Sequence, residues 1–247
     1  MRQYEKSLVL WRKKGSAIYA ENSEALKEFA IAFAYNSGKI ENDKITYRDT
    51  RKIFERGGAV SYSGDLKTLV EIRNAKEAYE FFLVSFVKRR PMDEEFIKET
   101  HRPLTQSTYD TMRLQLGERP GEYKKHDFVT GKEEVGAPPE DVSEEMAELL
   151  DEIQDVPDEK ILTAAAYFHA KIENIHPFAD GNGRTGRLAM NYLLVLHGHP
   201  PIVIHEEDRN EYYDALEAWD KSQLLEPMCV FLRQQAVKTW EKQSRQV

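Results

Sequence analysis

The fold and the chemistry of this chain are decided by one stretch, His176-Pro177-Phe178-Ala179-Asp180-Gly181-Asn182-Gly183-Arg184-Thr185-Gly186-Arg187. Its twelve residues include one imidazole, one carboxylate, three glycines and two guanidinium groups. A titratable base, a candidate metal ligand and a candidate anion cradle therefore lie side by side. This combination favours chemistry on a nucleotide phosphate.

The glycines precede an apolar run, 188–196, that is too hydrophobic for a surface helix and predicts a buried central helix. The first turn of a helix has free N–H groups and a partial positive charge, which together bind anions. Glycines let a phosphate approach the backbone closely, and Asn182 between them can add a side-chain donor. Arg184 and Arg187 lie three positions apart, so both guanidinium groups can face one anion.

Two further side chains complete the candidate site. A single carboxylate, here Asp180, commonly holds Mg²⁺ together with phosphate oxygens and waters. His176 is the residue of this stretch that can take up a proton near neutral pH. The stretch is neither a Walker A loop, because no Gly-Lys-Ser/Thr follows, nor a His-Glu-x-x-His zinc site. The structural alternative is a glycine-rich turn with a core histidine and two surface arginines.

The composition indicates which classes of partner and which cellular compartment to expect. The 247 residues carry a net charge of −8 and the pI is about 5.5, so we expect neither nucleic acid nor an anionic membrane surface as a partner. No run reaches the ~18 consecutive apolar residues of a membrane span. The single cysteine, Cys229, lies in an apolar run and is expected in the core, which fits a cytoplasmic location.

Helical patterns dominate the rest of the chain, and they predict an all-α fold in a single domain over 1–247. Leu26, Phe29, Ala30 and Phe33 recur with the spacing of one helix face. Further helices are expected at about 65–87, 92–117 with a break near Pro103, from about 143, 159–174, and 207–243 with a break at Pro227.

The segment 117–140 differs from its surroundings. Gly and Pro residues punctuate short β-prone pieces such as Phe128-Val129-Thr130, which makes this segment the strand candidate of the sequence. The pattern alone leaves two interpretations open, a small β-hairpin and a plain connector.

The stretch 176–187 matches the Fic-domain signature, H-x-F-x-D/E-G-N-G-R-x-x-R, at every fixed position, and the chain thereby resembles the Fic family. The similarity extends upstream over 166–175 and downstream over 196–202 and 212–216. This resemblance implies the Fic fold, a helical bundle around a buried central helix with a small β-hairpin flap.

Fic enzymes move AMP from ATP onto a Ser, Thr or Tyr hydroxyl of a target protein. The resemblance implies that His176 is the general base and that Asp180 holds Mg²⁺ against the α- and β-phosphates. It places Asn182 on the α-phosphate, Arg184 on the β-phosphate side and Arg187 on the γ-phosphate. The remaining residues implied for ATP are Gly181 and Gly183 of the anion hole, and Tyr212 or Tyr213 beside the adenine, where core packing is an equal alternative.

The resemblance also gives a role to the flap, at about 117–131. In the family, a hairpin with a G-x-Y pattern binds the target as an extended segment by strand addition. Gly121, Tyr123 and Lys124 match this pattern, with Lys124 where arginine is common.

An N-terminal segment, 22–46, precedes the expected Fic core at 92–205 and contains a second motif. The run Ser37-Gly38-Lys39-Ile40-Glu41-Asn42 matches the family's inhibitory pattern, S/T-x-x-x-E-G/N. Its serine and glutamate share one face if the run is helical. The resemblance implies that Glu41 pairs with Arg187 and keeps it from the γ-phosphate. The alternative is a helix end with a solvated glutamate.

The resemblance thus implies a protein adenylyltransferase that is restrained by Glu41, with ATP and a target protein as partners, and it is compatible with a homodimer. Three alternatives remain open: a relative that transfers phosphate or phosphocholine, one that removes AMP, and a non-catalytic nucleotide-binding module. The intact anion hole favours AMP transfer over phosphate transfer. The complete motif disfavours a module, because a sensor needs no base at His176.

Overall fold

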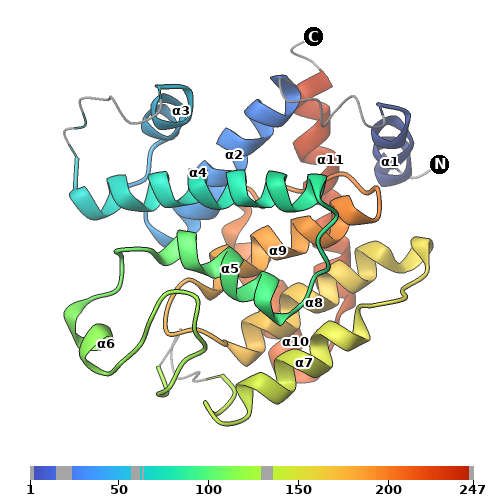
Figure 1. Cartoon of the computed structure of the whole chain (residues 1–247). Helices are drawn as coiled ribbons and strands as arrows, with labels where there is room; N and C mark the ends of the chain where they lie inside the picture. The colour runs from blue at the N-terminus through green and yellow to red at the C-terminus, as the bar shows by residue number, and fades with distance from the viewer. Residues whose placement is uncertain (1–2, 15–23, 57–61, 63, 129–135, 245–247) are drawn as a thin grey trace.

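The computed structural model describes residues 3–14, 24–56, 62, 64–128 and 136–244, and all regular structure in these ranges is helical. This confirms the all-α fold (Figure 1). The helices are α1 Gln3–Lys14, α2 Glu24–Glu41, α3 Tyr47–Arg56, α4 Leu66–Val87, α5 Glu94–Thr105, α6 Thr111–Gln115, α7 Val142–Glu152, α8 Ile161–Ile175, α9 Asn182–Leu196, α10 Arg209–Ser222 and α11 Glu226–Ser244, with short 3-10 helices η2 Asp158–Lys160 and η3 Glu206–Asp208.

The helix α9 forms the centre of the bundle. It contacts α8, α5, α4 and α2, and Figure 1 shows it with α2 and α4 above and α7 and α10 below. Leu188, Leu193 and Leu194 are buried on different sides of this helix. Asn191 is also buried, and its amide bonds both the N–H and the carbonyl of Ile202. The buried central helix predicted from the sequence is therefore confirmed.

The helix α2 places the second motif next to α9. Its residues Leu26, Phe29, Ala30 and Phe33 are all buried, which confirms the predicted apolar face. Because α2 packs against both α4 and α9, its C-terminal end lies beside the first turn of α9. Residues 22–23 of the expected N-terminal segment lie outside the described part of the chain.

The helix expected at 92–117 with a break near Pro103 is found as two helices, because α5 ends at Thr105 and α6 begins at Thr111. Pro103 lies inside α5 and does not break it. The end is fixed by a distant contact: the Asn74 amide of α4 donates to the carbonyl of Gln106 at 2.8 Å.

The C-terminal break also differs from its expected position. Pro227 lies in the first turn of α11, where its missing N–H is tolerated. The chain instead turns at Gln223, which follows α10 and has a φ of 52°.

The β-hairpin expected at 117–131 is not found in its described part, 117–128, which forms turns without a strand. Residues 129–131 lie outside the described part of the chain. The buried carboxylate of Glu118 accepts from the N–H of Lys125 at 3.0 Å and from the His126 ring at 3.0 Å. The N–H of Lys125 is therefore bonded to a side chain of its own segment and not to a second strand.

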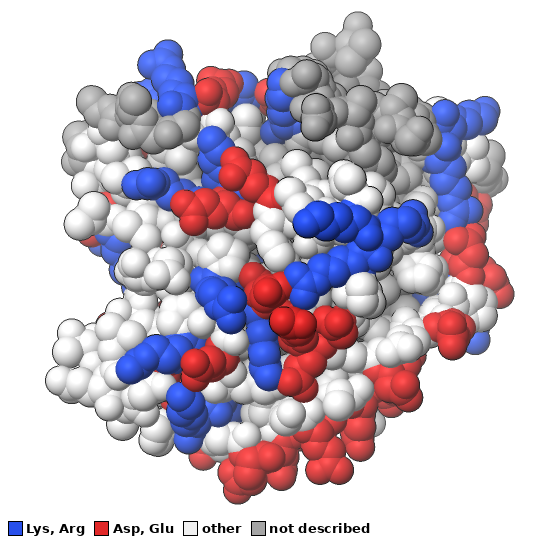
Figure 2. Space-filling model, in the orientation of Figure 1, with Lys and Arg blue, Asp and Glu red and all other residues white. Residues whose placement is uncertain are grey.

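The surface seen in Figure 2 carries both signs of charge. Acidic side chains gather along the lower edge of this face, where α7 lies, and basic ones are mixed with acidic ones over the middle. Among the described residues, no helix is both long enough and apolar enough to cross a membrane.

Candidate functional site

His176 stands at the C-terminal end of α8, in a left-handed conformation with φ 52° and ψ 59°. This conformation costs a non-glycine residue roughly 1–2 kcal/mol, and the neighbouring segment offsets it: the Ala137 N–H bonds the Ile175 carbonyl at 2.9 Å. The Nδ1 of His176 lies 3.4 Å from the Glu173 carbonyl, which favours a proton on that nitrogen. Burial lowers the pKa of His176 to about 4. The ring is therefore neutral at pH 7, and its Nε2 can accept a proton.

The loop that follows is closed on itself by Asn182. The N–H of Phe178 donates to Asn182 Oδ1, and Asn182 Nδ2 donates to the Phe178 carbonyl, both at 2.8 Å. The side-chain amide expected to reach a phosphate is thus engaged within the loop. The first bond of α9 runs from Thr185 N–H to the Gly181 carbonyl. The backbone N–H groups of residues 182–184 precede it and form the anion cradle.

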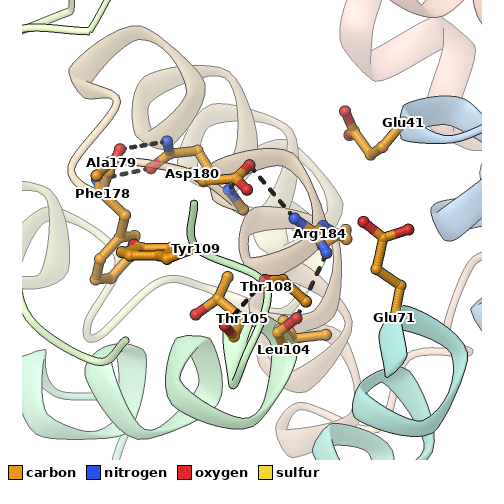
Figure 3. A network of polar contacts seen from close by, with 12 residues as sticks. Glu41, Glu71, Leu104, Thr105, Thr108, Tyr109, Phe178, Ala179, Asp180 and Arg184 are labelled. Carbon is orange, nitrogen blue, oxygen red and sulfur yellow. Dashed lines mark hydrogen bonds and ion pairs between the residues drawn. The ribbon is translucent and has the colours of Figure 1, made fainter. Parts of the chain in front are cut away.

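Asp180 and Arg184 lie on the rim of this cradle (Figure 3). Oδ1 of Asp180 accepts from Gly181 N–H at 2.7 Å and lies 3.4 Å from Arg184 Nη2. Arg184 Nη1 bonds the Leu104 carbonyl at 3.4 Å, while its buried Nε has no partner among the described residues. A buried donor without an acceptor fits a site that binds an anion.

A Mg²⁺ ion fits this donor set. The side chain of Asp180 is 35% exposed, so part of its carboxylate faces the pocket beside the anion cradle. Magnesium is usually held by one or two carboxylates, with phosphate oxygens and waters as its other ligands. In the described ranges, no group of three or more His, Cys, Asp or Glu side chains could hold a metal on its own.

Arg187 is bound by both predicted residues of α2. Its Nε donates to Ser37 Oγ at 2.9 Å, and its Nη2 lies 3.0 Å from the Ser37 carbonyl and 2.7 Å from Glu41 Oε1. The Arg187 side chain is 2% exposed, whereas that of Glu41 is 39% exposed. The pairing of Glu41 with Arg187 predicted from the sequence is therefore present in the structure.

A second polar group meets Arg187 from the other side. The hydroxyl of buried Tyr212 lies 3.3 Å from Arg187 Nη1, 2.8 Å from His169 Nε2 and 3.4 Å from Glu173 Oε1. Burial is the main cause that raises the pKa of Glu173 to about 7, with the charge of Glu41 adding to it and that of Arg187 opposing it. Tyr212 is thus a core side chain whose hydroxyl supports Arg187.

These groups surround a pocket of about 550 Å³, a size that suits a nucleotide. Its lining includes His176, the cradle and the two arginines, together with residues of α10. Tyr213 lies on that helix and is 42% exposed, so it offers an aromatic face to the pocket. The remaining α10 residues of the lining are Asp214, Leu216, Glu217 and Asp220.

The residues expected to bind a target at the flap lie mostly inside the protein. Lys124 is 3% exposed, and its N–H bonds the Pro177 carbonyl at 2.9 Å. The Tyr123 ring packs on Phe178 with centroids 5.4 Å apart. Gly121 is buried in a turn with φ 83°. These three residues anchor the segment to the loop that carries His176.

Sequence reasoning missed three polar residues that the structure brings to the site, His101, His169 and Glu173. His169 and Glu173 are four positions apart on the helix that leads to His176, and this spacing could have indicated a shared polar face. His101 lies 79 positions before Asp180, whose carbonyl its ring contacts at 2.8 Å. Nothing in the local sequence signals that contact.

Comparison with known proteins gives one family. Residues 91–194 match the Fic/DOC family. The protein adenylyltransferase Fic of Drosophila willistoni is 31% identical to this chain over 207 residues, which make up 82% of this chain and 40% of that protein. The protein of the same name from Nematostella vectensis is 31% identical over 195 residues, 78% of this chain and 44% of that protein. The chain therefore spans less than half the length of these curated relatives.

A solved structure resembles nearly the whole chain. The crystal structure of a Fic domain containing signaling protein from Bacteroides thetaiotaomicron matches it with a TM-score of 0.80 at 27% sequence identity. The match covers 96% of this chain and 94% of that one, so the resemblance includes α2 as well as the helices around α9.

Proposed function

We propose that this chain, which carries a Fic/DOC domain over residues 91–194, transfers AMP from ATP to a hydroxyl group of a target protein and is restrained by its own Glu41. The observation that carries this proposal is a neutral His176 beside an anion cradle whose Arg187 is held by Glu41 at 2.7 Å. The names of the relatives support the reaction class.

In the proposed reaction, a hydroxyl oxygen of the target attacks the α-phosphorus of ATP. The bond from that phosphorus to the bridging oxygen of the β-phosphate breaks, and pyrophosphate leaves. Nε2 of His176 takes the hydroxyl proton, which the neutral ring can accept at pH 7. The backbone N–H groups of residues 182–184 and the guanidinium of Arg184 stabilise the negative charge on the phosphates.

Asp180 would hold Mg²⁺ in this reaction. The ion, when bound, supplies positive charge beside the phosphates and so assists the departure of pyrophosphate. Arg184 and the loop N–H of Gly181 both contact the same oxygen of this carboxylate, Oδ1. This arrangement fixes the Asp180 side chain without using all of its lone pairs.

The proposed restraint acts through Arg187. An arginine that is bound by Ser37 and Glu41 has its nearest donors turned away from a γ-phosphate. ATP then lacks the contact that would align its leaving group with the attacking hydroxyl. A charge-assisted hydrogen bond is worth roughly 1.5–3 kcal/mol, which corresponds to about 10- to 150-fold in rate.

The target segment is proposed to lie along the exposed residues Lys125, His126 and Asp127. They lead to Phe128, which lines the pocket together with Arg113. An extended peptide beside an exposed backbone segment can be held by main-chain hydrogen bonds whatever its side chains are. The target hydroxyl would then reach His176 from the side of the pocket that Phe128 and Arg113 line.

The first test is transfer of label from ATP. We expect the Glu41→Gly variant, incubated with Mg²⁺ and ATP labelled at the α-phosphate, to label itself or proteins of a lysate about 10- to 150-fold faster than the unaltered chain. ATP labelled at the γ-phosphate should leave no label. Adding His176→Ala to Glu41→Gly should abolish the labelling while ATP still binds.

The matched control is Glu80→Gly, which makes the same exchange at an exposed position of α4. It should leave the rate unchanged. Label from the γ-phosphate would instead indicate phosphate transfer, and faster loss of AMP from modified protein with Glu41 present would indicate AMP removal. Binding of ATP without any transfer in the Glu41→Gly variant would contradict the enzyme and leave a nucleotide-binding module.

A further inference from the structure

His101 is a completely buried residue of α5 that joins two loops of the site. The N–H of Gly121 donates to its Nδ1 at 2.8 Å, and its Nε2 lies 2.8 Å from the carbonyl oxygen of Asp180. Its ring stacks on Phe178, with centroids 3.8 Å apart and planes inclined by 7°. One side chain therefore contacts the turn at 121 and two residues of the loop that follows His176.

These contacts fix which nitrogen of the ring carries the proton. Because Nδ1 accepts from a backbone N–H, it has no proton of its own, and Nε2–H donates to the Asp180 carbonyl. A ring that accepts at Nδ1 and donates at Nε2 carries one proton and is therefore neutral. The other polar groups beside it, the hydroxyls of Thr105 and Tyr109, lie 3.4–3.5 Å from the ring nitrogens.

The turn at Gly121 lies close against α5, the helix that carries this ring. Its φ of 83° suits glycine, and a Cβ there would lie 2.7 Å from Nε and 3.0 Å from Cβ of Arg102. The turn is therefore pressed against α5. Three residues later, the N–H of Lys124 bonds the Pro177 carbonyl next to His176. The same segment thus connects His101 to the proposed base.

We infer that His101 is a positioning residue that sets the Asp180 backbone and the turn at Gly121 relative to each other. Nε2 bonds the backbone of Asp180, the proposed Mg²⁺ ligand. Nδ1 bonds Gly121, at the start of the segment that leads to the proposed target-binding residues. The inference rests on the proposed function, because the roles of Asp180 and of the segment after Gly121 come from that proposal. It does not need the ring to touch ATP or the target.

Two substitutions separate the two contacts, each made in the Glu41→Gly chain. The amide nitrogen of glutamine takes a place near imidazole Nε2, so His101→Gln keeps a donor for Asp180 and loses the acceptor for Gly121. The amide oxygen of asparagine takes a place near Nδ1, so His101→Asn keeps the acceptor for Gly121 and loses the donor. His101→Phe keeps the stack on Phe178 and loses both bonds.

The readouts are Mg²⁺-dependent ATP binding, amide hydrogen exchange and AMP transfer. We expect His101→Asn to raise the Mg²⁺ concentration for half-maximal ATP binding about tenfold while residues 119–125 keep their protection. His101→Gln should speed exchange in 119–125 about tenfold and leave the Mg²⁺ requirement unchanged. His101→Phe should show both effects, and all three should slow AMP transfer.

If His101 acts through packing alone, His101→Gln and His101→Asn should change the Mg²⁺ requirement and the hydrogen exchange in the same way, or change neither. Either result would overturn the inference. If the substitutions prevent folding, histidine ¹⁵N NMR of the unaltered chain at pH 7 decides instead. A protonated Nε2 and a bare Nδ1 at His101 support the inference, and the opposite tautomer or a charged ring contradicts it. The proposed function is tested by a different result: it is wrong if the Glu41→Gly parent transfers no AMP, whatever the His101 variants show.

Discussion

Gly181 occupies a loop position at which the backbone conformation and the neighbouring helix both favour glycine. It is the N-cap of α9 with φ 83°, a conformation that favours glycine. A Cβ at this position would lie 2.5 Å from Cγ2 of Thr105 on α5. The backbone conformation and the close approach to α5 both exclude a side chain here. Glycine therefore lets the loop lie directly against α5.

Replacing Gly181 with alanine should destabilise the fold for two separable reasons. The left-handed conformation costs a non-glycine residue about 1–2 kcal/mol, and the contact with Thr105 adds to this. We expect urea unfolding to show a loss larger than the conformational cost alone.

The steric part can be isolated with Thr105→Ser, which removes Cγ2 and keeps the hydroxyl. Gly181→Ala should cost less in the Thr105→Ser background than in the unaltered chain. Equal costs in both backgrounds would show that the Thr105 methyl group imposes no constraint on the loop.

At the scale of elements, the end of α2 is fastened to α4 by Asn42. Its Nδ2 donates to Thr68 Oγ1 at 3.1 Å and to Glu71 Oε2 at 2.7 Å, while its Oδ1 accepts from Lys44 N–H at 3.0 Å. Figure 3 shows Glu41 and Glu71 on these two helices, both on the side of the site where Arg184 lies. The contacts of Asn42 therefore hold the residue that follows Glu41.

Asn42→Ala should loosen this end of α2 and weaken the hold of Glu41 on Arg187. We expect AMP transfer to rise by a few-fold, about the effect of one or two neutral hydrogen bonds and less than the rise in Glu41→Gly. Adding Asn42→Ala to Glu41→Gly should bring no further increase. A further increase would mean that Asn42 acts on the rate by another route.

The sequence predicted those elements whose pattern is local. The spacing of Leu26, Phe29 and Phe33 indicated α2, and the apolar run after the glycines indicated α9. It did not indicate α3, in which Thr50 and Ile53 alone are buried. The break after α5 was expected near Pro103, while its place at Thr105 involves a distant amide, that of Asn74.

The site could be predicted to a similar extent. The residues of 176–187 and their contact with Glu41 follow from two motifs. The turns at 117–128 could not be distinguished from a hairpin, because the buried carboxylate of Glu118 and the distant carbonyl of Pro177 take up backbone N–H groups of this segment, and no residue pattern signals either contact. The place of His101 depends on three segments that meet only in the fold.

For the whole molecule, burial sets a pH dependence of stability. It lowers the pKa of His101 and His169 to about 3 and that of His176 and His199 to about 4, from an ordinary value of 6.5. Below pH 6.5 these histidines become protonated in the unfolded chain but stay neutral in the folded protein. The unfolded state therefore binds more protons, and the free energy of unfolding falls as the pH falls. Glu173, with a pKa raised to about 7, acts in the opposite direction between pH 7 and 4.5.

We therefore expect the free energy of unfolding to decrease from pH 6.5 toward pH 4.5, as measured by chemical denaturation at a series of pH values. Glu173→Gln removes this opposing group, so its decrease should be steeper by up to about 1.4 kcal/mol per pH unit. A flat profile in the unaltered chain, or a shallower one in Glu173→Gln, would contradict this assignment of charges.

The unequal exposure of Arg187 and Glu41 has a consequence for how the site changes state. The Glu41 carboxylate is already partly solvated, whereas the Arg187 side chain is 2% exposed while Glu41 is bound to it. A buried cation without a counter-ion is strongly unfavourable. Under the proposed function, activation is an exchange of counter-ions, in which a phosphate of the nucleotide replaces the carboxylate of Glu41. The net gain from that contact would then be the difference in free energy between two ion pairs with Arg187.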